Sequence, residues 1–243
     1  MENNPFEPSL YADRELSVSK TFMSSVFSWM FVALIISAGM AYLFSSSMDL
    51  LSLLVNLETG KLNIFAYVVM FAPLLFVLAM GMGFHRFSYP VLLALFLAYA
   101  AVNGISLSFI FMAYSLGSIA TTFLVTSLTF GVMAVAGYTT QKDLTNFGSI
   151  MMMGLVGIII ASLINMFMHS QAMDYVISFI GVLVFTGLTA YDVQKLKVIG
   201  SGIAVQGKEV AGKTALMGAL NLYLDFINLF LFLLRLFGGR RGD

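Results

Sequence analysis

A stretch of 55 residues without Asp, Glu, Lys or Arg, from Phe87 to Gln141, is the strongest constraint on how this chain folds. At 1.5 Å of rise per residue it would form a helix about 80 Å long, whereas the hydrocarbon core of a bilayer is about 30 Å thick. The stretch must therefore cross a membrane at least twice, and we expect the turn near Met112 to Ser118. A second uncharged stretch, Leu144 to Met173, predicts one span and a short turn.

The composition also indicates an integral membrane protein, because 60% of the residues are hydrophobic, 10% are charged and the mean hydropathy is +0.95. Apolar runs between polar breaks predict seven spanning helices, at residues 22–44, 64–84, 90–112, 118–138, 148–168, 174–194 and 215–237. These runs are continuous and longer than the roughly ten residues of a barrel strand. The predicted fold class is therefore an all-α integral membrane protein, with a transmembrane domain at 22–237 between a polar tail at 1–21 and a short tail at 238–243.

Charge and cysteine content exclude several classes of function. The formal net charge is zero, so no overall field directs the protein to nucleic acid, and we expect no such partner. Cysteine is absent, which excludes disulfides, thiolate metal sites and cysteine nucleophiles. The first 21 residues lack the basic segment and short apolar run of a signal peptide, so we expect the first span to be a retained anchor.

The orientation in the membrane follows from Lys and Arg, because cytoplasmic loops carry an excess of these residues. If all seven helices span, eight basic residues fall on one side and three on the other. The eight are Arg14, Lys20, Arg86, Lys142, Lys195, Lys197, Lys208 and Lys213, and the three are Lys61, Arg240 and Arg241. The count predicts a cytoplasmic N-terminus and an external C-terminus. A re-entrant last segment is the alternative, because Arg235 adds to a basic end.

Three segments interrupt the apolar pattern with small or polar residues. The longest, Leu196 to Thr214, contains four glycines and no phosphate-binding motif, and it predicts a cytoplasmic loop. Residues 99–110 and 130–145 lie within predicted helices and contain Gly, Asn, Ser and Thr. We interpret these two as places of close helix packing.

Asp225 is an aspartate near the middle of the last predicted span, about 15–18 Å along the helix from the charged ends at Lys213 and Arg235. An aspartate there costs about 2.5–3.5 kcal/mol on insertion scales, so it should face the bundle interior or a wet cavity. Asn221, Asn228 and Arg235 fall on the same face, within an arc of about 80°. For the asparagines, hydrogen bonding between helices is the favoured interpretation. An ionisable group is not needed for that purpose, so Asp225 is a candidate functional residue.

Asp192, at the cytoplasmic end of the sixth predicted span, is the second candidate. Pairing with Lys195, three residues later, is the simpler interpretation of Asp192 alone. The sixth span ends where the seventh begins, so Asp192 and Asp225 could approach one another. Two carboxyl groups close together with little water would share a proton and titrate as a unit, as a proton-operated switch requires.

Arg86 follows the second predicted span on the same side as Asp192. Its placement fits the ordinary excess of basic residues on the cytoplasmic side, or a cation that latches ionised Asp192. His85 and His169 stand at helix ends, where contact with lipid headgroups is expected. Without thiols or a histidine pair at ligand spacing, zinc is disfavoured, and oxygen ligands favour a hard cation such as Ca²⁺. Asp192 and Asp225 would then make transient Ca²⁺ contacts, with no resident cofactor.

Four segments in chain order carry a resemblance to a known family: NGISLS at 103–108, GYTTQKDLT at 137–145, TGLTAYDVQKLK at 186–197 and NLYLDFINLFLFLLRLFG at 221–238. With them the chain resembles the transmembrane Bax inhibitor motif family, in its YccA-like bacterial branch, from about residue 20 onward. The resemblance implies six helices around a central seventh and a pH-sensitive calcium leak in a bacterial inner membrane. It also implies a two-aspartate proton sensor at Asp192 and Asp225, with an arginine latch at Arg86.

Three hypotheses follow. The first is a proton-gated leak whose partners are Ca²⁺, protons and membrane lipid. The second is a regulator of another membrane protein, docking through the segment from Lys195 to Lys213 or the N-terminal tail. The third, an intramembrane aspartyl protease, is disfavoured because Leu222 to Leu224, and no glycine, precede Asp225 and no Pro-Ala-Leu stretch follows. We therefore expect a protein that is not an enzyme.

Overall fold

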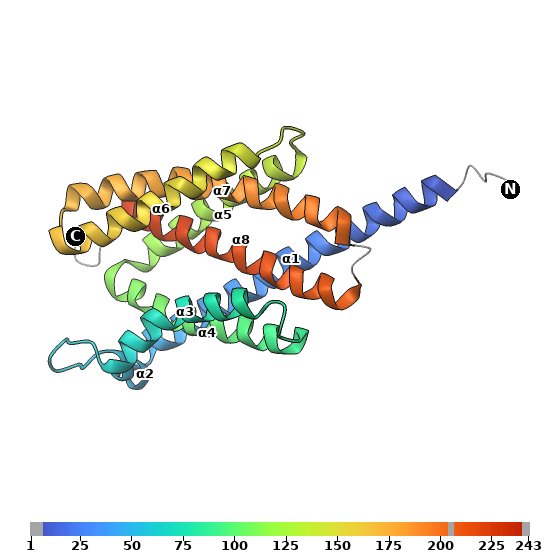
Figure 1. Cartoon of the computed structure of the whole chain (residues 1–243). Helices are drawn as coiled ribbons and strands as arrows, with labels where there is room; N and C mark the ends of the chain where they lie inside the picture. The colour runs from blue at the N-terminus through green and yellow to red at the C-terminus, as the bar shows by residue number, and fades with distance from the viewer. Residues whose placement is uncertain (1–6, 204–206, 240–243) are drawn as a thin grey trace.

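The computed structural model describes residues 7–203 and 207–239, with side chains from residue 18 onward. Within them the chain is all-helical, apart from short connections and one isolated bridge between Val55 and Leu62 (Figure 1). The helices are α1 (Glu7–Ser46), α2 (Met48–Leu54), α3 (Ile64–Gly83), α4 (Tyr89–Ala113), α5 (Leu116–Thr139), α6 (Thr145–Met168), α7 (Gln171–Gly202) and α8 (Lys208–Phe237).

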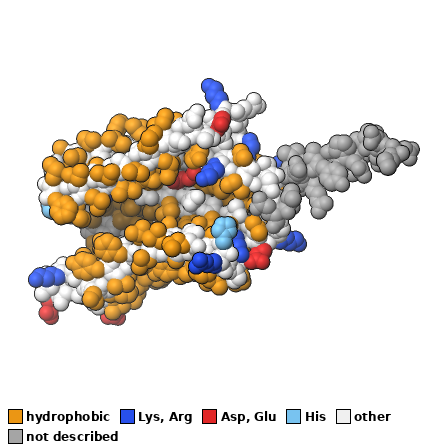
Figure 2. Space-filling view, viewed as in Figure 1, with side chains coloured by type: hydrophobic (Ala, Val, Ile, Leu, Met, Phe, Trp, Pro, Cys, Tyr) orange, Lys and Arg blue, Asp and Glu red, His pale blue; other side chains and the backbone are white. Residues whose placement is uncertain are grey.

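Seven of these helices are long and apolar enough to cross a membrane, which confirms the predicted all-α membrane fold. The apolar part of α1, Val18–Ser46, is the first of them. The expected turn in the uncharged stretch is also confirmed, because α4 ends at Ala113 and α5 begins at Leu116. On the face shown in Figure 2, charged side chains gather mostly toward the end from which α1 projects, and hydrophobic side chains cover much of the rest.

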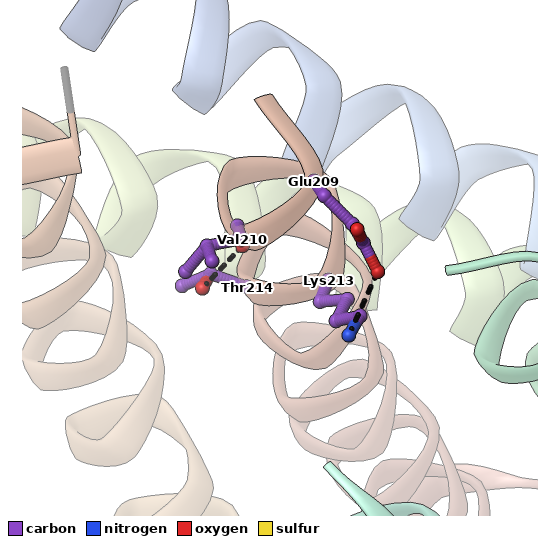
Figure 3. Close-up of polar contacts among 4 residues, drawn as sticks. All are labelled: Glu209, Val210, Lys213 and Thr214. Atoms are coloured by element: carbon purple, nitrogen blue, oxygen red, sulfur yellow. Dashed lines mark hydrogen bonds and ion pairs between the residues drawn. The ribbon is translucent and has the colours of Figure 1, made fainter. Parts of the chain in front are cut away.

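The prediction of a long loop at Leu196 to Thr214 is wrong. α7 continues to Gly202 and α8 begins at Lys208, so both helices run past the apolar segments that predicted them. The first turns of α8 are stabilised by its own side chains (Figure 3). Lys213 Nζ lies 3.0 Å from Glu209 Oε1, four residues earlier, and Thr214 Oγ1 donates a hydrogen bond to Val210 O. Such contacts support a helix outside lipid, where hydropathy gives no signal.

The N-terminal helix and the connection after it also differ from the prediction. α1 begins at Glu7, so most of the predicted polar tail continues the first span as a helix; residues 1–6 lie outside the described part. The short helix α2 was not predicted. Ser47 caps it by accepting a hydrogen bond from Leu50 N, and only Leu54 of α2 is fully buried. Seven residues with one buried side chain leave no apolar run long enough to detect.

α8 lies at the centre of the bundle and is the most buried of the seven spans (Figure 1). It packs directly against α1, α4, α5 and α7, whereas α3 packs mainly on α4 and α6 on α7. The expected central last helix is therefore confirmed, with four helices in direct contact with it and two on the outside. The main hydrophobic core follows α8, with Leu216, Leu220 and Tyr223 each 1% exposed or less.

The two ends of α8 lie at opposite ends of the bundle. Its first residue follows the α7–α8 connection, near α1, and its last residues contact the α4–α5 turn. Gly239 N donates a hydrogen bond to Ser118 Oγ, and Ser115 N donates one to Gly239 O. α8 therefore runs the whole length of the bundle as one continuous helix, as a spanning last segment requires. Arg240 and Arg241, which entered the charge count, lie outside the described residues.

Two glycines confirm that small residues mark close helix packing. A Cβ atom at Gly104 would lie 2.5 Å from Ser37 O, where α4 crosses α1. A Cβ atom at Gly137 would clash with Ala190 O, where α5 crosses α7. In both places the facing atom is backbone, so no side chain can move aside. At the second crossing the α7 residue is Ala190, two residues before Asp192.

Candidate functional site

Asp225 lies inside the bundle on the central helix, 5% exposed. Its Oδ2 atom is buried and has no hydrogen-bond partner among the described residues. A buried carboxylate without donors is unfavourable, because a charge taken from water needs compensation. The position therefore requires a proton, a cation or water.

Asp192 is the group that faces Asp225. The two carboxyl groups interact directly, from a half-buried position on α7, ten residues before that helix ends, and from the buried middle of α8. The structure therefore brings the two acids together, as the sequence suggested. The segment between them is mostly helix and not the loop that was predicted. Lys195 attracts Asp192 electrostatically but makes no ion pair with it in the described part of the chain; its Nζ lies 5.8 Å above the Tyr191 ring.

The half of α7 that carries Asp192 is fixed by two side chains, one to the α5–α6 connection and one to the last turn of α5. Gln194 accepts a hydrogen bond from Leu144 N and donates one to Lys142 O, both 2.8 Å long. Lys197 Nζ donates a hydrogen bond of 2.7 Å to Tyr138 O and lies 5.0 Å above that ring. Asp192 therefore projects from a braced part of α7.

In the same connection Asp143 accepts hydrogen bonds from the backbone and hydroxyl of Thr145, which lower the pKa of this exposed carboxyl group. Asp143 therefore stays ionised beside the fixed end of α7. It is outside the membrane-spanning helices and is not part of the aspartate pair.

The predicted polar seam of α8 is not one continuous interior surface. Asn221 and Arg235 are exposed, and Asn228 is half-buried and donates a hydrogen bond to Leu224 O within its own helix. The Arg235 guanidinium lies 5.6 Å from the Phe232 ring centre. Only Asp225 faces another ionisable group in the bundle interior. The four residues share a helix face, but the neighbouring helices cover only part of it.

Arg86 lies in the α3–α4 turn and is exposed. It makes no ion pair with Asp192 in this structure, which records one ion pair among the described residues, Lys213 with Glu209. The α3–α4 hairpin packs on α1 and α8, whereas Asp192 lies on α7. The latch role of Arg86 stays a prediction, and it requires a conformation in which the hairpin and α7 approach.

A second polar cluster in the bundle was missed in the sequence. Tyr223, fully buried, shares a hydrogen bond of 2.7 Å between its hydroxyl and Ser37 Oγ on α1, and it accepts one of 2.8 Å from Asn103 Nδ2 on α4. Ser37 Oγ also donates to Ala100 O. The ring packs edge-on against Tyr99 at 5.4 Å. A serine within the first apolar run and a tyrosine two residues before Asp225 were the available signals.

Asp192 and Asp225 together offer few ligands for a bound metal ion. The described residues contain no group of three or more His, Cys, Asp or Glu side chains that could hold one. Ca²⁺ usually takes six to eight oxygen ligands, so two carboxylates would have to be supplemented by water. Asp192 and Asp225 therefore fit brief contacts with a hydrated cation better than a closed metal site.

Comparison with known proteins agrees with this architecture. The family described as "Inhibitor of apoptosis-promoting Bax1" matches residues 19–242. The chain belongs to this family of Bax inhibitors. It is 42% identical to "Inner membrane protein YbhL" of Escherichia coli (strain K12), covering 91% of this chain and 93% of that protein. It is also 42% identical to protein RP147 of Rickettsia prowazekii, over 91% of each chain.

A more distant Bax inhibitor relative is the membrane protein SpyM3_0260 of Streptococcus pyogenes serotype M3, 36% identical over 94% of this chain and 96% of that one. These matches confirm the resemblance that the four sequence segments indicated. The family match, over residues 19–242, includes both aspartates and the α3–α4 turn. The family and the seven spans establish a multi-pass integral membrane protein.

Proposed function

We propose that this Bax inhibitor homologue is a pH-sensitive leak for Ca²⁺, gated by the proton count of Asp192 and Asp225. One observation carries the proposal: Asp225, buried in the central helix with an unpartnered oxygen, faces Asp192. A hydrogen bond between two helices does not need two carboxyl groups, because the side-chain amide of Asn or Gln can make it. Two facing carboxyl groups with little water share a proton and respond to pH as one unit.

Gating follows from the change in charge of the pair. With one shared proton the two groups attract each other and hold α8 against α7. With both ionised they repel, and with both protonated they lose the charge that attracts a cation. The charged groups that face the pair are few: Lys195 acts on Asp192, and Lys197 is turned to Tyr138 O. The pair therefore dominates its own electrostatics.

A role for Arg86 belongs to the same proposal. In a conformation with ionised Asp192, this arginine would supply the missing counter-charge, provided that the α3–α4 hairpin moves toward α7. The α3 side of the hairpin, which leads into Arg86, is suited to move, because α3 packs mainly on α4 and is among the least buried spans, whereas α4 is packed against α1. The name of the Escherichia coli relative supports a bacterial inner membrane as the location.

The experiment is Ca²⁺ flux into liposomes that hold the purified protein, across about pH 5 to 9. Wild type is compared with Asp225→Asn, which keeps size and hydrogen bonding but cannot ionise. The matched control is Asp49→Asn, an exposed acid in α2. We expect a pH-dependent flux in wild type and Asp49→Asn, and a flat profile in Asp225→Asn.

An unchanged pH profile in Asp225→Asn would refute the proton sensor. Absence of flux from folded wild-type protein would refute the leak and favour a regulatory protein that contacts another membrane protein. Cleavage of a transmembrane substrate that requires both acids would instead support the protease. A regulator would dock through the segment between Lys195 and Lys213. This segment is mostly helix, so the docking surface would be formed by the ends of α7 and α8.

A further inference from the structure

A pocket opens between the first turns of α5 and the last turns of α8, at the end of the bundle opposite the N-terminus. Its volume is about 280 Å³, and it is lined by Gly117, Ser118, Thr121, Thr122, Val125, Leu233 and Phe237. One wall carries the three hydroxyl groups of α5 and the other the apolar side chains of α8. The pocket is roomy enough for several water molecules with polar partners.

The hydroxyl groups of α5 continue inward beyond the pocket. Thr122 lines the pocket, and Thr126, one turn further along α5, is fully buried. Residues four apart lie on the same helix face, so Thr126 extends the polar wall toward the middle of the bundle. Its hydroxyl donates to Thr122 O, as a buried threonine in an apolar interface must.

Four phenylalanines meet at the α5–α8 interface beyond the pocket: Phe130, Phe226 and Phe230 are buried, and Phe123 is 41% exposed at its edge. The Phe226 ring lies between Phe123 and Phe130, with centroid distances of 5.4 and 5.5 Å. Phe230 lies 6.2 Å from Phe123. Leu233 lines the pocket and lies about 12 Å along α8 from Asp225, so Phe226 and Phe230 stand between them. The cluster thus separates the pocket from the aspartate pair.

We propose that ions pass between the aspartate pair and the outer pocket along the α5–α8 interface, and that this phenylalanine cluster is the constriction that closes the route. The inference rests on the proposed leak, since a constriction matters only where ions pass. A narrow apolar passage excludes water, and a cation cannot cross it without leaving its hydration shell. Removal of one central ring should therefore admit water.

The constriction is coupled to the proton sensor through the chain itself. Phe226 directly follows Asp225 on α8, so a rotation of α8 that separates Asp225 from Asp192 also turns Phe226 away from its neighbours on α5. The braced end of α7 and the close crossing of α5 and α7 at Gly137 keep the other two helices in place. The same movement of α8 would break the acid contact, release the hydrogen bonds of Tyr223 to Ser37 and Asn103, and widen the passage.

Accessibility to a thiol reagent tests the route, because the chain has no cysteine of its own. Single cysteines are placed at Thr122 and Thr126, and a third at Leu128, which is 70% exposed on the outer face of α5. The probe is a charged, water-soluble methanethiosulfonate, applied to protein in lipid nanodiscs. We expect Thr122→Cys to react, Thr126→Cys to react slowly and Leu128→Cys, in lipid, not to react.

Adding Phe226→Ala should raise the reaction rate of Thr126→Cys by about tenfold or more, because the dry barrier is lost. The matched control is Phe185→Ala, which removes a buried ring of α7 that stacks on Phe232 and not on the rings of the phenylalanine cluster. Phe226→Leu, which keeps an apolar side chain, should act in the same direction if the alanine variant does not fold. An unchanged rate, or an equal rise in Phe185→Ala, overturns the inference.

The flux assay separates this inference from the proposed function. Phe226→Ala should increase Ca²⁺ flux at the pH where wild type conducts least, and Phe185→Ala should not. Lack of wild-type flux refutes the leak, whereas the thiol-labelling rates still report whether the phenylalanine cluster excludes water. Normal wild-type flux with no effect of Phe226→Ala refutes only the constriction.

Discussion

Asp225 and Asn221 show how neighbouring helices decide the role of single residues. They lie one turn apart on the same face of α8, yet Asn221 is exposed and Asp225 is buried. The sequence placed both on one polar seam. Asp225 also meets Asp192 of α7, which gives it an ionisable neighbour. The chemistry of Asp192 and Asp225 therefore depends on how α7 packs against α8. The residue pattern of α8 alone does not contain that information.

Asp192→Asn tests this contact at the residue scale. The new amide would offer a neutral donor to the unpartnered Oδ2 of Asp225, so we expect a gain of about 1–3 kcal/mol in the free energy of unfolding at neutral pH. Thermal unfolding in detergent measures it, with Asp49→Asn as the control that should change little. A loss of stability would mean that the charge of Asp192 itself holds α8 in place.

At the scale of helices, the buried Tyr223 cluster anchors α8 on the side away from the aspartates. Tyr223→Phe should destabilise the bundle by about 1–2 kcal/mol, because Asn103 and Ser37 each lose a partner in an apolar interior. Tyr67→Phe is the matched control, since Tyr67 is 51% exposed on α3. Unfolding in increasing fractions of a denaturing detergent compares the two. Equal stability of both variants would show that the cluster adds nothing to helix association.

The crossing of α5 and α7 yields a second prediction. Gly137→Ala would place a methyl group against Ala190 O, so the helices must separate, at a cost of about 1–3 kcal/mol or more. Gly131→Ala on the same helix has nothing within 4 Å, and should be neutral or stabilising by up to about 1 kcal/mol. Thermal unfolding of both, with the flux profile, tests whether the crossing positions Asp192. Equal melting temperatures would contradict the close approach.

The same elements show what sequence reasoning can reach. The continuous apolar runs predicted α4 and α5 within two residues at each end, because lipid imposes both length and composition. Outside lipid that signal ends, so the extensions of α7 and α8 were interpreted as a loop and α2 was missed. Ser37 and Tyr223 each lie within an apolar run, and nothing in either run indicates a polar partner. Their hydrogen bond joins helices that are far apart in the sequence, so no sign of it is present in either run.

At the scale of the whole molecule, the chain connections and the charges agree. The end of the bundle at which α1 begins also holds the α3–α4, α5–α6 and α7–α8 connections, and with them most of the basic residues of the chain. The opposite end holds α2, the α4–α5 turn, the α6–α7 turn and the end of α8. Because basic residues are retained in the cytoplasm, the first end should be cytoplasmic. The outer pocket would then face the other side of the membrane.

Single cysteines in the natural cysteine-free chain can test this orientation. Glu58 lies in the exposed turn after α2, and Gln141 is exposed in the α5–α6 connection at the other end. In spheroplasts, an impermeant maleimide should label Glu58→Cys at once and Gln141→Cys only after the membrane is permeabilised. Labelling of both after permeabilisation controls for reactivity. The reverse pattern would place the half-buried Asp192 near the outside, so that external pH, not cytoplasmic pH, would set the proton count of the pair.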